Sequence, residues 1–291
     1  MKQFLSYLAW VLIAVGAFFA VRAAAGSCDK GPSITWKPVL MDGHRAGAQP
    51  ITLDNVDTAL GVFGDNGYTS PAGVQYADGE MVPEVAKVIL EVQPYMTELK
   101  QVIGHSAGMY MNDRDNPDLP LGNFTVDALT DYGSKFFKVK MDFGLLNFGG
   151  IRVPMPEGAV TLDDISSMFP FVNYLAYAKV KGAGIIKILE QLAGQDAFQA
   201  VSGVKAVVKN HKLESATIGG KPIDPKKVYN VTTIDFLLDG GDQIAVGAVA
   251  DKVVLSHELV KDIMIKHIKN LEAKGQLIEC KSDGRVIMTE E

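Results

Sequence analysis

The chain has 291 residues, of which 47% are hydrophobic and 21% are charged, and its formal net charge is −6. This composition is sufficient for a packed core and excludes a disordered chain, while the acidic balance argues against nucleic acid as the main partner. Two cysteines, Cys28 and Cys280, are too few for a disulfide scaffold or a cysteine-rich zinc site.

The first 27 residues have the pattern of an export signal. Lys2 precedes an uncharged apolar run over 4–21, and Arg22 and a run of small residues lead to Cys28. A cysteine in this place resembles the lipobox of bacterial lipoproteins, which predicts lipidation of Cys28 and a periplasmic, outer-membrane or cell-surface location. Two alternatives stay open: cleavage after Ala25, which leaves Cys28 as a thiol or a partner of Cys280, and retention of the apolar run as a membrane anchor.

After this signal, residues 28–80 form an N-terminal extension and residues 81–291 the main domain. The extension is rich in Gly, Asp and Pro, with one short predicted helix over 53–60.

The main domain alternates between predicted helices and strands. Apolar residues at three- and four-residue steps predict a helix over 83–102 with a break near Pro94, and a second helix covers 123–132. The later predicted helices are 184–192 and 257–274, and the predicted strands are 143–148, 175–180, 205–208 and 228–233, with a turn at Gly219-Gly220. This mixed order predicts an α/β or α+β fold.

Several common functional motifs are absent or incomplete. Gly182-Ala183-Gly184 opens a helix, but Lys187 stands where a dinucleotide-binding motif needs its third glycine. Gly219-Gly220-Lys221 lacks the other residues of a phosphate-binding loop and is best explained as a hairpin turn. The five histidines are scattered, which offers no metal site, and His267 falls on the apolar face of the last helix as a core or edge residue.

Three short stretches have a composition that suggests ligand binding. The first, over 147–152, combines two glycines, which let a backbone approach a ligand, with an arginine that can clamp an anion. The second, over 170–173, and the third, over 236–242, each offer a phenylalanine beside a loop. Two such rings can sandwich a planar base, and nearby Asn and Asp side chains can bind sugar hydroxyls or a base edge.

In this order, the three stretches resemble the C-terminal domain of the 5′-nucleotidase family over about residues 82–287. Further landmarks of the resemblance are Leu121-Gly122-Asn123, Asp127-Ala128, Val201-Ser202-Gly203, Gly220-Lys221-Pro222-Ile223, Tyr229 and Asp283-Gly284-Arg285. The resemblance implies a layered domain with mixed sheets that binds the nucleotide.

The resemblance also implies roles for individual residues. Phe171 and Phe236 match the aromatic pair that stacks on the base. Asn147, Gly149, Gly150 and Arg152 match the family's Asn-Gly-Gly-Gly-Ile-Arg loop, whose arginine contacts phosphate. Asp242 matches the aspartate that contacts the ribose, and Asn173 matches an asparagine of bacterial members.

Two positions depart from the family pattern. Phe148 replaces the first glycine of the loop. Asp115 stands where the family usually has an arginine, so the neighbouring Arg114 is a candidate phosphate ligand only by proximity.

The family's catalytic domain, a metallophosphatase with two metal ions, has no counterpart in this sequence. We therefore expect a stand-alone, exported substrate-binding half, without a catalytic residue or cofactor of its own, whose partner metallophosphatase supplies the divalent metals and the attacking water. The alternatives are a surface protein that binds nucleotides or nucleosides without hydrolysis and an interaction domain with an inactive pocket. An independent enzyme is the least favoured alternative, because the sequence shows no nucleophile, metal cluster or acid–base pair.

Overall fold

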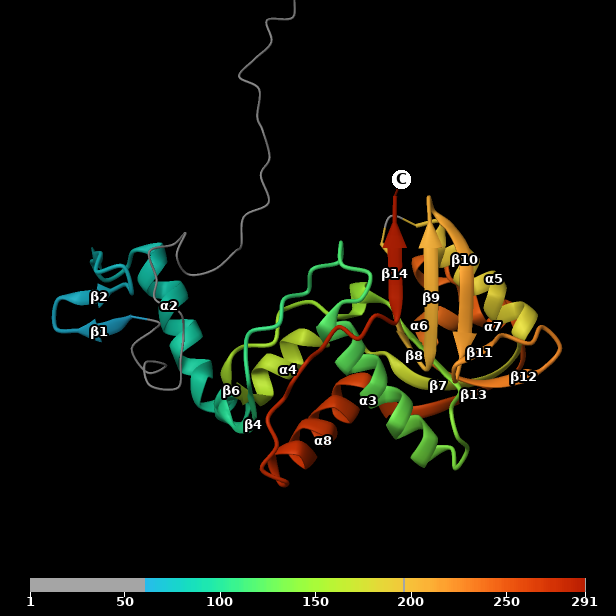
Figure 1. The fold of residues 1–291 in the computed structure, drawn as a ribbon. Helices are drawn as coiled ribbons and strands as arrows, with labels where there is room; N and C mark the ends of the chain where they lie inside the picture. The colour runs from blue at the N-terminus through green and yellow to red at the C-terminus, as the bar shows by residue number, and fades with distance from the viewer. Residues whose placement is uncertain (1–60, 196, 291) are drawn as a thin grey trace, which may run out of the picture. The chain divides into compact units, whose positions relative to one another are not determined.

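The computed structural model describes residues 61–195 and 197–290 (Figure 1). The chain divides into two compact units, 1–84 and 85–291. The predicted signal, Cys28 and the predicted helix over 53–60 lie outside the described residues. Within the described ranges, no helix has the length and apolar character needed to cross a bilayer.

The described part of the first unit is a small antiparallel sheet of order β1-β2-β3, formed by Val62–Gly64, Gly67–Thr69 and Gln75–Tyr76. Tyr68 is buried at its centre, with its ring 4.9 Å from the ring of Phe63 and 6.3 Å from that of Tyr76. Helix α2 (Met81–Val92) then leads into the second unit, followed by the 3-10 helix η1 (Gln93–Lys100).

A five-stranded sheet of order β13-β7-β12-β5-β8 is the centre of the second unit. Its strands are β5 (Phe143–Leu146), β7 (Tyr174–Lys181), β8 (Ala200–Ser202), β12 (Val228–Ile234) and β13 (Ala250–Leu259). β5 runs parallel to β12, while the other pairs are antiparallel. Helix α3 (Pro120–Phe136) packs on four of these strands and on α8 (Val260–Glu272).

A second sheet of four strands has the order β11-β10-β9-β14. It consists of β9 (Val204–Lys209), β10 (Lys212–Ile218), β11 (Lys221–Pro222) and β14 (Val286–Thr289), with β14 parallel to β9. Helix α5 (Gly182–Ala193) contacts both β7 and β10 and so links the two sheets. Gly219 and Gly220 have φ values of 60° and 75°, as a tight hairpin turn requires, which confirms the predicted turn.

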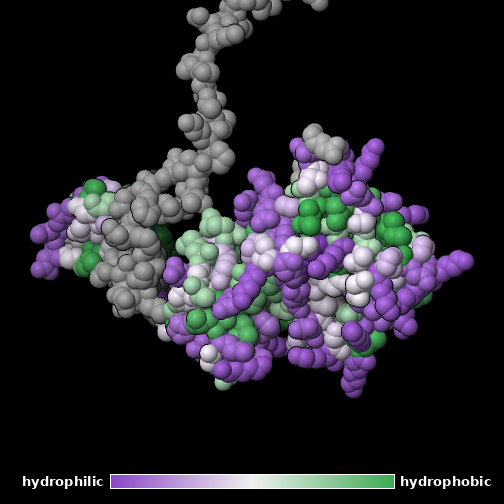
Figure 2. Space-filling model, in the orientation of Figure 1, coloured by the Kyte–Doolittle hydropathy of each residue, from purple (hydrophilic) through white to green (hydrophobic). Residues whose placement is uncertain are grey.

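The remaining elements are short. β4 (Val102–Ser106) pairs with β6 (Gly158–Thr161), and α4 (Leu162–Met168) follows directly, opened by a capping box between Thr161 and Asp164. Around the strand ends lie η2 (Phe148–Gly150), α6 (Asp235–Leu238), η3 (Gly241–Gln243) and α7 (Val246–Val249). On the face that Figure 2 shows, the second unit is mostly hydrophilic with small hydrophobic patches, as is normal for a folded surface.

The mixed α/β class is confirmed, and two predicted helices are wrong at one end. In the helix predicted over 83–102, the break expected near Pro94 is confirmed, because α2 ends at Val92 and the 3-10 helix η1 follows. The predicted end is wrong, since Val102 begins β4. The helix predicted over 257–274 begins only at Val260. Residues 257–259 belong to β13, where pairing with β7 outweighs the local helical pattern.

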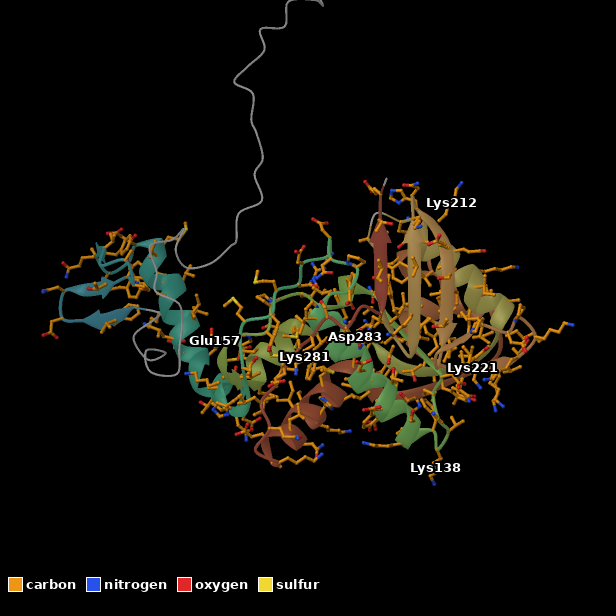
Figure 3. The ribbon with its side chains drawn as sticks, viewed as in Figure 1. Lys138, Glu157, Lys212, Lys221, Lys281 and Asp283 are labelled. Carbon is orange, nitrogen blue, oxygen red and sulfur yellow. The ribbon has the colours of Figure 1, made fainter. Side chains whose placement is uncertain are left out.

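A polar cluster around the buried Arg285 ties the C-terminal segment to the rest of the unit; we call Asp118, Asp127, Asp283 and Arg285 the Arg285 cluster. Asp118 is also buried, whereas the carboxylates of Asp127 and Asp283 are about half-exposed. All five N–H donors of Arg285 are used. They bind both oxygens of Asp127 (2.8 Å each), both oxygens of Asp283 (2.7 and 2.9 Å) and the carbonyl of Val201 (2.8 Å). The hydrogen bond from Arg285 lowers the pKa of Asp283. Asp283 and Lys281 are labelled in Figure 3 on the segment that leads from α8 to β14.

Asp118 completes this cluster. One of its oxygens accepts from Asn123 Nδ2 (2.7 Å) and the other from the backbone N–H groups of Asp283 (3.0 Å) and Gly284 (2.7 Å). The family landmarks at 127, 201 and 283–285 therefore meet through the hydrogen bonds of the Arg285 cluster.

Candidate functional site

Three predicted stretches converge at one end of the central sheet. β5 and β12 are parallel, so both finish at this end, and antiparallel β7 begins there, with Leu175 opposite Ile234. The loop after β5, the loop before β7 and the segment after β12 carry the candidates Asn147, Phe171 and Asp242. The sheet topology thus brings together residues that are up to 95 positions apart.

A hydrogen bond joins the first and third stretches. Asn147 Nδ2 donates to Asp242 Oδ2 over 2.7 Å. Asn147 is only 4% exposed, yet its Oδ1 has no hydrogen-bond partner among the described residues. Reversing the amide would set two oxygen atoms against each other, so this bond fixes the amide orientation. The site therefore contains a buried acceptor without a donor, which is uncommon in a folded protein.

The two glycines of the loop make room for this pair. A Cβ atom at Gly149 would lie 3.2 Å from Asn147 Nδ2 and 3.4 Å from Asp242 Oδ2, and one at Gly150 would lie 3.2 Å from Asn147 Oδ1. At these distances a methyl group would fit closely against the pair without a severe clash. The glycines thus leave the space above the Asn147–Asp242 bond open.

Phe148, the residue that departs from the family pattern, turns into the core. Its ring is buried, and a Cβ atom at Gly122 would lie 2.7 Å from it. Its backbone N–H donates to Gln199 Oε1 over 2.7 Å. The absence of a side chain at Gly122 in α3 therefore accommodates the extra ring, and the loop keeps its hydrogen bonds.

Arg152 lies at the surface beside Phe171. Its guanidinium carbon is 5.7 Å from the centroid of the Phe171 ring, and its Nη1 donates to the carbonyl of Gly149 over 3.3 Å. The backbone N–H of Arg152 is bound to the carbonyl of Met168 (3.0 Å), which fixes where the side chain leaves the loop. The arrangement brings a permanent positive charge next to one of the predicted stacking rings.

The two predicted stacking residues are both half-exposed: Phe171 is 48% and Phe236 is 42% accessible. Asp235 connects their segments, because its Oδ1 accepts from the N–H groups of Tyr174 (3.0 Å) and Phe236 (2.9 Å). The Phe236 ring lies over Gly241, where a Cβ atom would be 2.4–2.5 Å from three ring carbons. Large aromatic side chains left at the surface on two adjoining segments can offer a face to a planar ligand.

Asn173 lies beside Phe171 at the start of β7. The two residues line a small hollow together with Leu146, Gly150, Phe169 and Val260. The carbonyl of Asn173 accepts from the N–H of Val260 over 3.0 Å, which ties this loop to the start of α8. The structure thus places Asn173 and Phe171 next to the glycine loop.

Arg114 is exposed on the loop between β4 and α3. This loop runs beside the glycine loop, because Tyr110 and Met155 exchange backbone hydrogen bonds of 3.0 Å and Asn112 Nδ2 donates to the carbonyl of Ile151. Arg114 follows Asn112 by two residues, and none of its hydrogen bonds or ion pairs within the described ranges joins it to the other candidates.

Sequence reasoning missed four residues that shape the site. Gln199 binds the backbone of Phe148, and Asp235 connects the phenylalanine segments. Gln191 and Gln195, at the end of α5, donate to the carbonyls of Gln243 and Asp242 respectively. No sequence motif marks these residues, because each of them binds backbone groups. Apart from the N–H of Phe236, which follows Asp235 directly, these groups lie at least 47 positions away in the sequence.

Elsewhere in the second unit, burial shifts the pKa of several titratable side chains, His267 and Cys280 among them. It lowers the pKa of His267, which packs edge-on against Phe124 with 5.2 Å between ring centroids, as expected for a core or edge histidine. It raises the pKa of the Cys280 thiol to about 12. In the part of the chain that the structure describes, no three His, Cys, Asp or Glu side chains gather as a metal site would require.

Comparison with solved structures supports the class of fold. The 5′-nucleotidase precursor of Thermus thermophilus matches with a TM-score of 0.65 and 22% identity, over 76% of this chain and 45% of that one. The Haemophilus influenzae NAD nucleotidase matches with a TM-score of 0.55 and 18% identity, over 84% of this chain and 46% of that one. The fold is therefore that of a portion of such enzymes.

The sequence comparisons are more specific. The model of the family described as 5′-nucleotidase, C-terminal domain matches residues 102–248, and the chain belongs to this family. Protein UshA of Salmonella pullorum is 28% identical over 171 residues, covering 55% of this chain and 30% of that protein. A 5′-nucleotidase of Vibrio vulnificus is 30% identical over 109 residues, covering 36% and 20%. The chain thus spans less than a third of the length of these curated relatives.

Proposed function

We propose that this protein binds a nucleotide or nucleoside with its base between Phe171 and Phe236. The observation that carries the proposal is the combination, at one sheet end of a 5′-nucleotidase C-terminal domain, of two half-exposed rings and the buried Asn147 Oδ1, which has no donor in the described part of the chain. An aromatic sandwich accepts the π-face of any base. An unmatched Asn147 Oδ1 favours a ligand that brings its own hydroxyl or amino donor.

Asp242 and Arg152 complete the proposed contacts. The second oxygen of Asp242 accepts no bond from the described residues and suits a ribose hydroxyl. Among the described residues, the exposed guanidinium of Arg152 makes one long hydrogen bond and lies beside the Phe171 ring, so it can turn toward a phosphate group. Gly149 and Gly150 keep the space between these groups open, and Asn173 and Arg114 are secondary candidates for the base and the phosphate.

In the proposed reaction this chain supplies binding and orientation, and a separate metallophosphatase supplies the chemistry. Divalent metals bound by that partner would activate water and stabilise the developing charge on the phosphate. The phosphate must be positioned within about an ångström for this, so the two proteins would dock closely. We also propose export, with lipidation of Cys28 as the membrane anchor.

Calorimetry with adenosine and AMP tests the binding step. We expect Phe171→Ala to weaken both about tenfold or more, since stacking contributes about 1–3 kcal/mol per base. Phe136→Ala is the matched control, because Phe136 is 44% exposed on α3 outside the site. If the unaltered protein binds neither ligand, the result would favour the alternative of an interaction domain with an inactive pocket.

Phosphate release from AMP tests the partner step. The purified protein is mixed with a candidate metallophosphatase and a divalent metal, and we expect a rate above that of the metallophosphatase alone. The gain should disappear with Phe171→Ala and persist with Phe136→Ala. Binding without any such gain would favour nucleotide capture without hydrolysis.

The membrane anchor is tested by fractionation. In a bacterial host, the unaltered protein should take up labelled fatty acid and sediment with membranes, whereas Cys28→Ser should do neither. Equal behaviour of the two forms would contradict the lipid anchor.

A further inference from the structure

The segment that carries Asp242 has an unusual backbone. Gly240 has a φ of 97°, and the next non-glycine residues, Asp242 and Gln243, have φ values of 49° and 62°. Two consecutive non-glycine residues in the left-handed region are uncommon and persist only where the surroundings hold them. Something outside the segment must therefore stabilise this conformation.

The end of α5 provides that support. Gln195 Nε2 donates to the carbonyl of Asp242 over 3.3 Å, and Gln191 Nε2 donates to the carbonyl of Gln243. Gln191 lies in the last turn of α5, and Gln195 lies just beyond the C-cap Gly194. Each binds the carbonyl of one of the two left-handed residues.

The same segment is held from the opposite side through its side chain. Asn147 donates to Asp242 Oδ2, while the backbone N–H of Ile244 closes the turn on the carbonyl of Gly241 over 2.9 Å. The glutamines thus fix the backbone of Asp242, and Asn147 fixes one carboxylate oxygen. The direction of the remaining oxygen is then determined.

We infer that Gln191 and Gln195 are positioning residues that aim the Asp242 carboxylate and thereby set the preference for ligands that carry a ribose over free bases. This inference rests on the proposed function. Among the described residues, no hydrogen bond or ring contact joins either glutamine to Phe171 or Phe236. Their loss should therefore affect the sugar contact and leave base stacking intact.

The test compares adenosine with adenine by calorimetry. The double variant Gln191→Met, Gln195→Met keeps the side-chain lengths and removes both donors. We expect its affinity for adenosine to fall about tenfold, as one mispositioned hydrogen-bonding carboxylate predicts, while its affinity for adenine stays within about twofold. Glu190→Met, at an exposed neighbouring position of α5, is the control and should change neither affinity.

Amide hydrogen exchange gives a readout that needs no ligand. In the double variant the Ile244 N–H should exchange faster, because the turn that it closes loses its support, whereas amides of α3 should be unchanged. Unchanged exchange at Ile244 would overturn the positioning role.

The outcomes separate this inference from the proposed function. If the unaltered protein prefers adenosine and the double variant keeps the preference, the inference is overturned and the proposed function stands. An equal loss of both ligands would also overturn it, since it would indicate a general structural role. If the unaltered protein binds neither ligand, both the inference and the proposed function fail.

Discussion

The Arg285 cluster and the site around Asn147 and Asp242 are both polar, lie in the same unit and were both marked by family landmarks. In the Arg285 cluster every N–H of the guanidinium has an acceptor, and both oxygens of Asp118 have donors. At the other site, Asn147 Oδ1 is buried without a partner among the described residues, and Asp242 has a left-handed backbone.

This difference separates two reasons why a polar residue can define a family. A cluster that satisfies its own hydrogen bonds stabilises the fold and leaves nothing for a ligand. A site with an unmatched acceptor and half-exposed rings gives up some stability, which a ligand can restore. The resemblance assigned ligand contacts to Asn147 and Asp242 but no role to Asp127 and Arg285, and the hydrogen bonds of the fold now give these two a structural role.

The largest expected effect comes from opening the Arg285 cluster. Arg285→Met should reduce the free energy of unfolding by about 2 kcal/mol, because it removes five hydrogen bonds of a guanidinium that is only 11% exposed, while the half-exposed carboxylates of Asp127 and Asp283 can bind water instead. Urea denaturation measures this loss. Arg114→Met, at an exposed arginine, should stay within about 0.5 kcal/mol of the unaltered protein. Similar free energies of unfolding for the two variants would show that the Arg285 cluster does not stabilise the fold.

Displacing the Phe236 ring should reduce the affinity for adenosine far more than it reduces the free energy of unfolding. In Gly241→Ala the new methyl group would lie 2.4–2.5 Å from the Phe236 ring, so the half-exposed ring must turn away. We expect adenosine affinity to fall about tenfold through weaker stacking, with a stability change under about 1 kcal/mol. Gly194→Ala is the matched control, since its nearest neighbours would be 3.6 Å away. Unchanged binding by Gly241→Ala would argue against stacking on Phe236.

The unmatched acceptor provides a smaller test. Asn147→Ala removes the bond to Asp242 and also removes the buried Oδ1, so the two stability effects oppose each other and should leave a net change within about 1 kcal/mol. Adenosine affinity should fall about fivefold, as the loss of one hydrogen bond of about 1 kcal/mol predicts. Thermal unfolding and calorimetry on the same samples measure both quantities. A large loss of stability would indicate that Asn147 mainly stabilises the fold, which would contradict a ligand-binding role for its unmatched oxygen.

The smallest effect concerns a partly exposed pair on α8 and β13. Lys266 Nζ is 2.7 Å from Glu258 Oε2, and this hydrogen bond, supported by one from Tyr132, lowers the pKa of Glu258 below its ordinary 4.5. A carboxylate with a lowered pKa contributes stability above its unfolded pKa, and the contribution is lost as the pH falls through the folded pKa.

Because Lys266 is half-exposed, Glu258→Gln should cost less than about 1 kcal/mol at pH 7. Urea denaturation at several pH values should show the difference from the unaltered protein shrinking below pH 4.5. A difference that persists at low pH would exclude the ion pair as its cause.

The sequence predicted the elements whose local pattern and final environment agree. The apolar spacing of α3 and α5, the buried runs of β5, β7 and β12 and the alternating pattern of β9 each indicate their structure directly. β10 and β13 were missed because they are largely exposed and lack a continuous apolar face. Their pairing with β9 and β7 defines them, and such long-range pairing leaves no local pattern.

The candidate site shows the same division. The resemblance identified the residues that face the proposed ligand, and the topology of β5, β7 and β12 brings their segments to one place. The residues that hold them, Gln191, Gln195, Gln199 and Asp235, act through backbone groups. A side chain that binds a carbonyl or N–H far along the chain has no characteristic neighbour in the sequence, so only the fold identifies it.

The position of Arg285 beyond the family-matched segment has a consequence for folding. Residue 278 exchanges backbone bonds with the strand that begins at Val102, and Arg285 connects to Asp127 across 158 positions. Contacts of such sequence separation form late and slowly. A nascent chain that has reached residue 248 contains the whole family-matched segment, yet it lacks β13, α8, β14 and Arg285. The hydrogen bonds of the Arg285 cluster can therefore form only after nearly the whole chain has been synthesised.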